Sequence, residues 1–308
     1  MSKPTADVAG IAYALRDVTV EYGRTVALDH LSLQVARGTW MSVLGRNGAG
    51  KSTLIKLLAT LLQPTFGQVE LDGINVARKP GLARRHLGYV PQSGSLDGRL
   101  TVRENLEFFA AMQGLRGGAR RSAIDQALAP FDAFADRLVA QLSTGQKRRV
   151  EVARALMHDP DIVILDEATA GIDAQSRQAI WDSLQQMRQT RRVTVIMTSH
   201  FIEEIGQTDR CCILHKGQLL GEWATPDLLR DYGGQFYRMT AKDAAAQDTL
   251  LAALPGAAID PTSGDVVVTL TQHDPALLAL IAAHSARLHV TPAPLDRAIV
   301  EATARLAR

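Results

Sequence analysis

One stretch decides the fold expected of this chain: Gly45-Arg46-Asn47-Gly48-Ala49-Gly50-Lys51-Ser52. It fits the pattern G-x-x-x-x-G-K-[ST], a loop whose glycines let the backbone curl so that successive N–H groups point at phosphate oxygens. An apolar run at residues 40–44 precedes it and is typical of a strand, and residues 53–58 are typical of the first turns of a helix. This strand–loop–helix order predicts a nucleoside triphosphate site that uses the partial positive charge of the helix N-terminus.

The side chains of this phosphate loop (residues 45–52) have separate expected roles. We expect Lys51 to reach the β- and γ-phosphates and the hydroxyl group of Ser52 to bind Mg²⁺. The rest of the predicted cradle comprises Gly45, Arg46, Asn47, Gly48, Ala49, Gly50 and Thr53.

A set of short motifs, in a fixed order along the chain, resembles the ATP-binding cassette (ABC) ATPases. Leu142-Ser143-Thr144-Gly145-Gln146 is similar to that family's signature, usually L-S-G-G-Q, with Thr144 in place of a glycine. Residues 162–167, Ile-Val-Ile-Leu-Asp-Glu, look like its Walker B strand. The other matches are Tyr22 for the aromatic residue that stacks on adenine, Gln92 for the Q-loop glutamine, Asp173 for the D-loop and His200 for the switch histidine.

The resemblance implies ATP hydrolysis with Mg²⁺. Asp166 would hold the metal ion, directly or through water, and Glu167 would polarise the attacking water. His200 would touch the γ-phosphate and keep Glu167 in line, while Gln92 would contact Mg²⁺ or the water. Two acidic residues at the end of an apolar strand are costly unless metal or donors pair with them. The predicted catalytic set is therefore Glu167, His200, Gln92 and Lys51, and the predicted metal ligands are Ser52, Gln92 and Asp166.

The signature segment predicts a second phosphate-binding position. A helix that opens with small hydroxyl and glycine residues is an anion site. In the ABC family two cassettes dimerise head to tail, and each signature caps the ATP of the other copy. The resemblance thus implies a homodimer or pseudo-dimer, closed by ATP and opened by hydrolysis. It adds to the expected nucleotide-binding residues Ser143, Thr144, Gly145, Gln146 and Asp173.

Composition limits the function classes. The 308 residues are 46% hydrophobic and 21% charged, as in ordinary globular proteins with one large or two modest domains. A formal charge of +2 gives no reason to expect nucleic-acid binding. The adjacent Cys211 and Cys212 lack the spacing of a disulfide framework or a metal site. No apolar run approaches the roughly 20 residues of a membrane helix. We therefore expect a cytoplasmic protein, peripheral at the membrane through a separate permease.

The order of elements predicts an α/β fold. Strands in βα units favour a mostly parallel sheet flanked by helices, and the resemblance implies a P-loop NTPase cassette with N-terminal antiparallel strands and a helical subdomain at about residues 93–158. We expect short strands near residues 14–20 and 31–35, an amphipathic helix at 174–190, and a loop at glycines 114, 117 and 118. Thr101 and Glu104 predict a capping box.

A second unit is predicted after the cassette. We expect the ABC domain to span residues 1–228 and a small accessory α/β domain to span 235–308, with strands at 235–240, 266–271 and 287–291. Asp274-Pro275 is a helix start. Residues 294–303 resemble the closing helix of cassettes in drug-resistance and nodulation exporters. This unit carries no phosphate loop or metal spacing, so we expect it to regulate or reinforce the assembly.

The predicted function is that of the ATP-binding subunit of an ABC transporter, of the exporter type. The alternative is a cassette ATPase without a transport role, in translation, DNA repair or envelope regulation. Translation-type members usually carry two cassettes in one chain, and repair-type members interrupt the cassette with long coiled coils; neither feature occurs here. The signature and His200 argue against a P-loop kinase. The transported substrate is not predicted, because its binding site would lie on the membrane chain.

Overall fold

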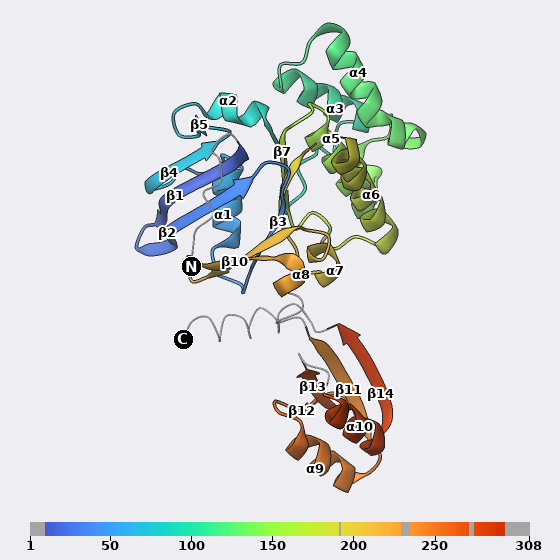
Figure 1. The fold of residues 1–308 in the computed structure, drawn as a ribbon. Coiled ribbons are helices and arrows are strands. Elements are labelled where there is room, and N and C mark those ends of the chain that lie inside the picture. The colour runs from blue at the N-terminus through green and yellow to red at the C-terminus, as the bar shows by residue number, and fades with distance from the viewer. Residues whose placement is uncertain (1–9, 191, 229–233, 271–273, 293–308) are drawn as a thin grey trace. The chain divides into compact units, whose positions relative to one another are not determined.

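The computed structural model describes residues 10–190, 192–228, 234–270 and 274–292 (Figure 1). The chain divides into two compact units. The first comprises Met1–His200 and Thr208–Glu222, and the second comprises Phe201–Gln207 and Trp223–Arg308. Within the described ranges, no helix combines the length and the apolar character that a membrane crossing requires.

The first unit is built on a six-stranded sheet with the order β10-β9-β3-β8-β7-β6. Strand β3 pairs in parallel with β8 and β9, and β7 pairs in parallel with β6 and β8. Every residue of β3, β7 and β8 is buried, because helices or a second sheet cover both faces. The strands are β3 (Trp40–Gly45), β6 (Leu87–Val90), β7 (Ile162–Asp166), β8 (Thr194–Thr198), β9 (Arg210–His215) and β10 (Gln218–Ala224).

The alternation of side chains along the central strands creates a core on each face of the sheet. In β7, Ile162 and Ile164 belong to one hydrophobic cluster, and Val163 and Leu165 belong to another. Helix α1 (Lys51–Leu58) covers the first face, and α5 (Thr144–Leu156) and α6 (Ala174–Thr190) cover the second (Figure 1). The predicted mostly parallel α/β fold is confirmed.

An antiparallel sheet with the order β2-β1-β4-β5 packs against the other side of α1. The sequence predicted short strands here, but β1 (Ile11–Tyr22) and β2 (Thr25–Ala36) have 12 residues each. Bulges interrupt their pairing, and Asp17 adopts a left-handed φ of 53°. These irregularities break the period-two pattern and hide the full strand length. Strands β4 (Phe66–Leu71) and β5 (Ile74–Asn75) complete the sheet.

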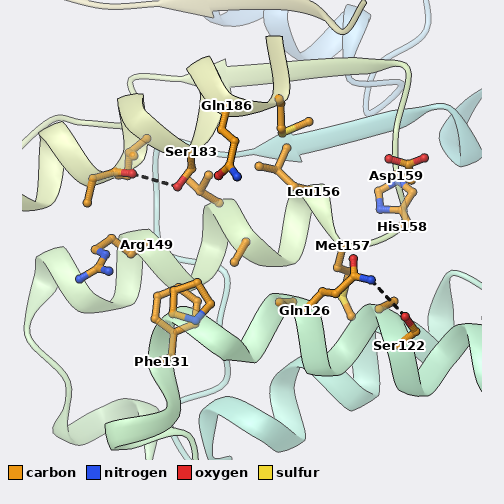
Figure 2. A pocket seen from close by; sticks show the side chains of 18 of the residues that line it. Ser122, Gln126, Phe131, Arg149, Leu156, Met157, His158, Asp159, Ser183 and Gln186 are labelled. Atoms are coloured by element: carbon orange, nitrogen blue, oxygen red, sulfur yellow. Dashed lines mark hydrogen bonds between the residues drawn. The ribbon is translucent and has the colours of Figure 1, made fainter. Parts of the chain in front are cut away.

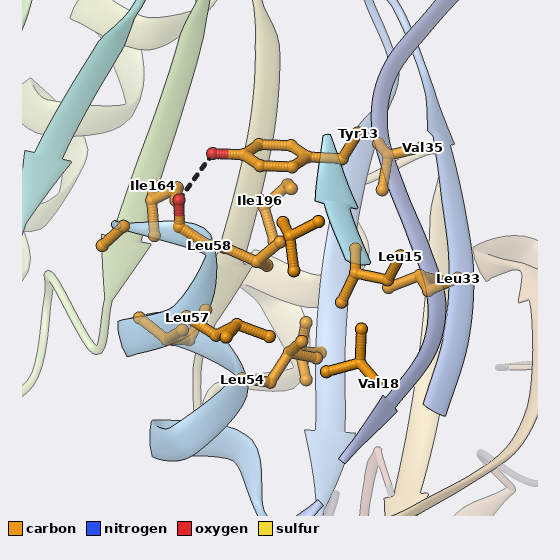
Figure 3. Close-up of a cluster of buried hydrophobic side chains, with 14 of the residues drawn as sticks. Tyr13, Leu15, Val18, Leu33, Val35, Leu54, Leu57, Leu58, Ile164 and Ile196 are labelled. Carbon is orange, nitrogen blue, oxygen red and sulfur yellow. Dashed lines mark hydrogen bonds between the residues drawn. The ribbon is translucent and has the colours of Figure 1, made fainter. Parts of the chain in front are cut away.

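Helix α1 is clamped between the two sheets, which fixes the loop that precedes it (Figure 3). The hydroxyl group of Tyr13 on β1 donates a hydrogen bond to the Leu58 carbonyl at 2.7 Å, and burial raises the pKa of Tyr13. Leu54, Leu57 and Leu58 of the helix lie in one hydrophobic cluster with Leu15 and Val18 of β1, Ile164 of β7 and Ile196 of β8.

A helical segment lies between β6 and β7. It contains α3 (Val102–Met112), α4 (Gly117–Leu128), two 3₁₀ turns (Ala129–Phe134 and Val139–Gln141) and α5, around a hydrophobic cluster of their own. The predicted capping box of Thr101 and Glu104 is present at the start of α3. The prediction that Gly117 and Gly118 lie in a loop is wrong, because α4 begins at Gly117. The short helix α2 (Pro80–Arg85) lies between β5 and β6.

In the second unit an antiparallel sheet of the order β12-β13-β11-β14 packs against α9 (Ala244–Ala253) and α10 (Pro275–His284). Asp274 caps α10 ahead of Pro275, as predicted. The predicted tail helix at 294–303 and most of the boundary segment at 229–235 lie outside the described residues, so the domain limits remain a prediction. The remaining elements are α7 (Ile202–Ile205), α8 (Thr225–Leu228), β11 (Gln235–Ala241), β12 (Ala258–Ile259), β13 (Val266–Leu270) and β14 (Ser285–Pro292).

Candidate functional site

The phosphate loop connects the end of β3 to α1. Gly50 at the N-cap has a φ of 105°, and no side chain caps the helix, so amide donors of the first turn face outward from the helix end. Glycine is required at both ends of the loop, since a Cβ atom on Gly45 would lie 2.6 Å from the Leu214 carbonyl oxygen and one on Gly50 would lie 2.7 Å from that of Ala27. The loop therefore has the backbone of an anion cradle.

Lys51, the first residue of α1, folds back over this loop. Its Nζ atom donates to the carbonyl oxygens of Gly45 at 2.7 Å and Arg46 at 3.2 Å. The neighbouring Ser52 is exposed. The ammonium group thus lies against the loop predicted to bind the phosphates, and the predicted Mg²⁺ ligand Ser52 follows it in the first turn of α1.

Tyr22 ends β1 at the tip of the β1–β2 hairpin, and its ring is 48% exposed. The following strand runs close to the phosphate loop, as the approach of Gly50 to Ala27 indicates. An exposed aromatic side chain is free to stack on a base, and this role of Tyr22 stays a prediction.

Two acidic residues follow one another at the carboxyl end of β7. Asp166 is buried, and its Oδ1 atom accepts a hydrogen bond from the Thr198 hydroxyl group at 2.9 Å. The same hydroxyl oxygen accepts from the Glu167 amide at 3.0 Å. Glu167 adopts a left-handed φ of 47°, so the chain turns sharply between the two carboxylates. Burial raises the pKa of Asp166, as expected for a carboxylate held close to apolar surroundings.

The carboxylate of Glu167 brings together residues from three segments. Its Oε2 atom accepts a hydrogen bond from Gln92 Nε2 at 2.8 Å, and its Oε1 atom lies 2.9 Å from His200 Nε2. Three of the four predicted catalytic residues therefore meet at one carboxylate. Each carboxylate oxygen has about two lone-pair sites, so Glu167 retains acceptor capacity for a water molecule.

The signature segment forms the N-terminus of α5. Ser143 Oγ accepts from the Gln146 amide at 3.2 Å, and Gln146 Oε1 accepts from the Ser143 amide at 2.9 Å. Because Ser143 Oγ acts as the acceptor in this capping box, its hydroxyl hydrogen stays available for an anion. Thr144, where the family usually has glycine, is exposed and is not among the residues with positive φ. A side chain is therefore tolerated at that position.

Gly145 is buried against the D-loop of the same chain. A Cβ atom on Gly145 would lie 2.8 Å from Asp173 Oδ2, and it would also collide with the Ser176 hydroxyl group. Asp173 accepts from the Ser176 amide and hydroxyl groups, both at 2.8 Å, and these bonds lower the pKa of Asp173. The predicted nucleotide-binding residue Asp173 thus caps the first turn of α6 in this structure.

The sequence analysis missed two polar residues at the site. Thr198, which bridges Asp166 and Glu167, is a polar residue at the carboxyl end of a parallel strand, and that position could have drawn attention to it. Arg148 lies buried on α5 beside the backbone of Gln92 and Glu167. Arg148 and Glu151 lie three positions apart in the predicted helix, and this charged pair among its apolar residues could have indicated a buried ion pair.

Two hollows lie near α5. A groove of about 780 Å³ runs between α4, α5 and α6, and none of the predicted site residues lines it (Figure 2). A smaller cavity of about 210 Å³ is lined by Gln92, Thr144, Arg148 and Glu151, among others. The smaller cavity therefore connects the Q-loop to the signature helix.

Comparisons with known proteins identify the family of this chain. Residues 28–170 match the model of the ABC transporter family. The chain is 35% identical over 252 residues to the daunorubicin resistance ATP-binding protein DrrA3 of Streptomyces coeruleorubidus, covering 80% of this chain and 79% of that protein. It is 38% identical over 227 residues to the Nod factor export ATP-binding protein I of Mesorhizobium japonicum, covering 73% and 66%.

Two further similarities extend the comparison. The chain is 40% identical over 217 residues to the probable multidrug ABC transporter ATP-binding protein YbhF of Escherichia coli, and this match spans 70% of the chain but only 37% of YbhF. The dimeric post-hydrolysis structure of the ATP-binding cassette MJ0796 with ADP and Pi has a TM-score of 0.63 and 29% identity, covering 69% of this chain and 98% of that one. The chain belongs to the ATP-binding proteins of the ABC transporter family.

Proposed function

We propose that this chain is the ATP-hydrolysing subunit of an ABC exporter and acts with a separate membrane-spanning permease. The observation that carries the proposal is the convergence of Gln92 and His200 on the two oxygens of Glu167, within 2.9 Å in each case. A carboxylate held from both sides is oriented to act as a general base toward a water molecule. Lys51, at the mouth of the cradle, would neutralise phosphate charge.

The residues present fit a Mg²⁺ ion. Magnesium prefers hard oxygen ligands, and the chain offers the exposed hydroxyl group of Ser52, the amide oxygen of Gln92 and the buried carboxylate of Asp166. A buried carboxylate with a raised pKa gains most from a nearby cation. When bound, the ion would neutralise charge on the transferred phosphate. Thr198 holds Asp166 through its hydroxyl group.

We further propose that two copies of the chain form composite sites. The exposed Ser143 and Thr144 begin α5, and the phosphate loop begins α1. The α5 N-terminus of one copy would cap the nucleotide bound to the phosphate loop of the other. The dimeric state of the MJ0796 cassette supports dimerisation of this chain.

Export and location follow from the relatives by analogy. Their names refer to multidrug transport, daunorubicin resistance and Nod factor export, which favours an exporter over a role in translation, DNA repair or envelope regulation. The permease would hold the chain at the cytoplasmic face of the membrane. Residues 1–228 would form the ATPase domain, and residues 235–308 would brace or regulate the assembly.

The test of this function is phosphate release from ATP by the purified chain, alone and with the membrane protein encoded beside its gene. We expect Mg²⁺-dependent hydrolysis and co-purification of the two chains. A version that ends at Asp231 should keep hydrolysis per folded cassette and change assembly. The absence of hydrolysis both alone and with the membrane protein would contradict the proposal.

A further inference from the structure

Arg148 is an arginine of α5 with only 6% of its surface exposed, and it lies two positions after the signature segment. Its guanidinium group donates to backbone carbonyls of two separate segments. Nη1 contacts the Pro91 oxygen at 2.6 Å, Nε contacts that of Ala168 at 2.5 Å and Nη2 contacts that of Glu167 at 3.0 Å. One side chain thus joins the segment before Gln92 to the segment that carries Glu167.

A buried carboxylate holds the arginine in place. Glu151 Oε2 lies 2.8 Å from Arg148 Nη1, and the two side chains are 3% and 7% exposed. The other oxygen of Glu151 accepts from the Ser95 amide at 2.5 Å. Arg154, one turn further along, donates to the Ser95 carbonyl at 2.7 Å. Arg148, Glu151 and Arg154, on successive turns of α5, therefore form hydrogen bonds with the backbone of residues 91–95.

The buried ion pair of Arg148 and Glu151 is not explained by a contribution to the stability of the fold. The desolvation of a buried ion pair offsets most of its Coulomb attraction, and apolar residues of similar volume often replace such a pair without loss. The pair also borders the cavity of about 210 Å³, so it does not fill space as a packed core would. What the pair does provide is fixed hydrogen bonds to the backbone around two predicted catalytic residues.

The backbone of Glu167 needs such support. Its φ of 47° lies in the left-handed region, which L-residues occupy only when their surroundings hold them there. The Thr198 hydroxyl group holds its amide, and Arg148 holds its carbonyl group. The residue is therefore fixed on both sides of its Cα atom, and one of the two holds comes from the signature helix.

We propose that Arg148 is a positioning residue that ties α5 to the backbone beside Gln92 and at Glu167. A phosphate bound at the α5 N-terminus then acts on the catalytic carboxylate of the same copy, and through it on the second composite site of the dimer. This inference rests on the proposed function. It assigns to the chain a direct mechanical connection between the two sites.

The experiment compares turnover with nucleotide affinity in the full-length chain. The variants are Arg148→Met, Arg148→Lys and the double variant Arg148→Met/Glu151→Met, which removes both buried charges together. Arg149→Met is the matched control, because the adjacent Arg149 lies over the Phe131 ring instead. We measure kcat by phosphate release, and the dissociation constant of a fluorescent ATP analogue.

We expect the double variant to lose kcat by about 10²-fold, the effect of a small misplacement of catalytic groups, while its nucleotide affinity stays near that of the wild type. Arg148→Lys should retain part of the activity, because an ammonium group reaches fewer carbonyls than the guanidinium fork does. Arg149→Met should hydrolyse ATP as the wild type does. A folded double variant with wild-type kcat would overturn the proposal.

One variant and one further measurement keep the test decisive when the methionine variants or the ATPase assay fail. If both methionine variants fail to fold, Arg148→Lys decides, and an unchanged kcat in that variant refutes the proposal. If the wild type hydrolyses ATP neither alone nor with the membrane protein, the proposed function fails by itself. Hydrogen exchange at residues 91–95 and 166–168 then decides the inference about Arg148. Faster exchange in Arg148→Lys supports it, and exchange equal to that of the wild type rejects it.

Discussion

Helices α1 and α5 both begin with residues predicted to bind phosphate, yet their N-termini differ. At α1 the N-cap is Gly50 and no side chain caps the helix. At α5 the N-cap Ser143 exchanges hydrogen bonds with Gln146 in a capping box. The backbone amides at the start of α1 have no side-chain cap and lie at the end of the phosphate loop. The start of α5 is capped by its own residues, and Ser143 and Thr144 are exposed there.

One chain therefore holds unequal parts of the proposed site. The open terminus of α1 has a lysine beside it, and the carboxylate of Glu167 is already contacted by Gln92 and His200. The α5 terminus offers the hydroxyl hydrogen of the exposed Ser143, followed by the exposed Thr144, and we propose that it serves a nucleotide held by another copy. Under this proposal one chain assembles the catalytic half, which is the phosphate loop with Glu167 and its two contacts. The capping half, which is the α5 N-terminus, must come from a partner copy.

The largest effect on ATP turnover should come from a change at Glu167, in the half of the site that one chain assembles. Glu167→Gln should keep ATP binding and lose turnover by roughly 10²–10⁴-fold, because the aligned base is lost while the carboxamide still fits between Gln92 and His200. Lys51→Ala should instead weaken ATP binding. Phosphate release and nucleotide binding measure the two effects. Near-normal hydrolysis by Glu167→Gln would remove this residue from the mechanism.

The second-largest effect on turnover should come from Gly145, which packs against the D-loop at the start of α5. Gly145→Ala places a Cβ atom in collision with the Ser176 hydroxyl oxygen and 2.8 Å from Asp173 Oδ2, so these side chains or the helix start must shift. We expect turnover to fall by about 10- to 100-fold, since a displacement of this size misaligns reacting groups. The control is Gly118→Ala in α4, where a Cβ atom meets nothing within 4 Å. Equal turnover in the two variants would show that Gly145 does not position the signature.

The third prediction concerns the pH dependence of Mg²⁺ binding at Asp166, in the half of the site that one chain assembles. Burial raises the pKa of Asp166, so the folded protein takes up this proton at a higher pH than the unfolded chain does. Acid should therefore stabilise the nucleotide-free fold through this group and, over the same range, compete with Mg²⁺ for the carboxylate. The Mg²⁺ concentration for half-maximal ATP binding should rise from neutral to mildly acidic pH. A Mg²⁺ requirement independent of pH would refute the assignment of Asp166.

The smallest effect should come from Thr144→Gly, which restores the residue usual in the family signature. Thr144 is exposed at the first position of α5, so its replacement should alter helix stability by less than about 1 kcal/mol. Turnover should stay near that of the wild type. A large gain in activity would mean that the threonine side chain obstructs the nucleotide, contrary to its exposed position here.

The sequence predicted the parts of the site that local spacing determines. The phosphate loop, the end of β7 and the start of α5 are short motifs, and the structure has a loop, a strand end and a helix start at those places. Contacts between distant residues could not be predicted in the same way. Pro91 and Arg148 are 57 positions apart, and Asp166 and Thr198 are 32 apart, so only the folded topology brings them together.

Local irregularity explains the predictions that failed. Bulges in β1 and β2 broke the alternation that reveals strand length, and glycines at 117 and 118 suggested a loop where α4 begins. Glycine is a poor helix former in the interior, but the first turn depends less on propensity than on the packing that follows. Ile124, Ala127 and Leu128 supply that packing.

Light scattering after size exclusion gives the mass of Glu167→Gln protein at saturating ATP and so decides whether two copies share the site. We predict a dimer with ATP and a monomer without it, because each α5 terminus caps the nucleotide of the other copy. The added change Ser143→Arg should leave the protein monomeric with ATP bound. A Glu167→Gln protein that binds ATP fully and stays monomeric would contradict the central claim that the second half of the site comes from a partner copy.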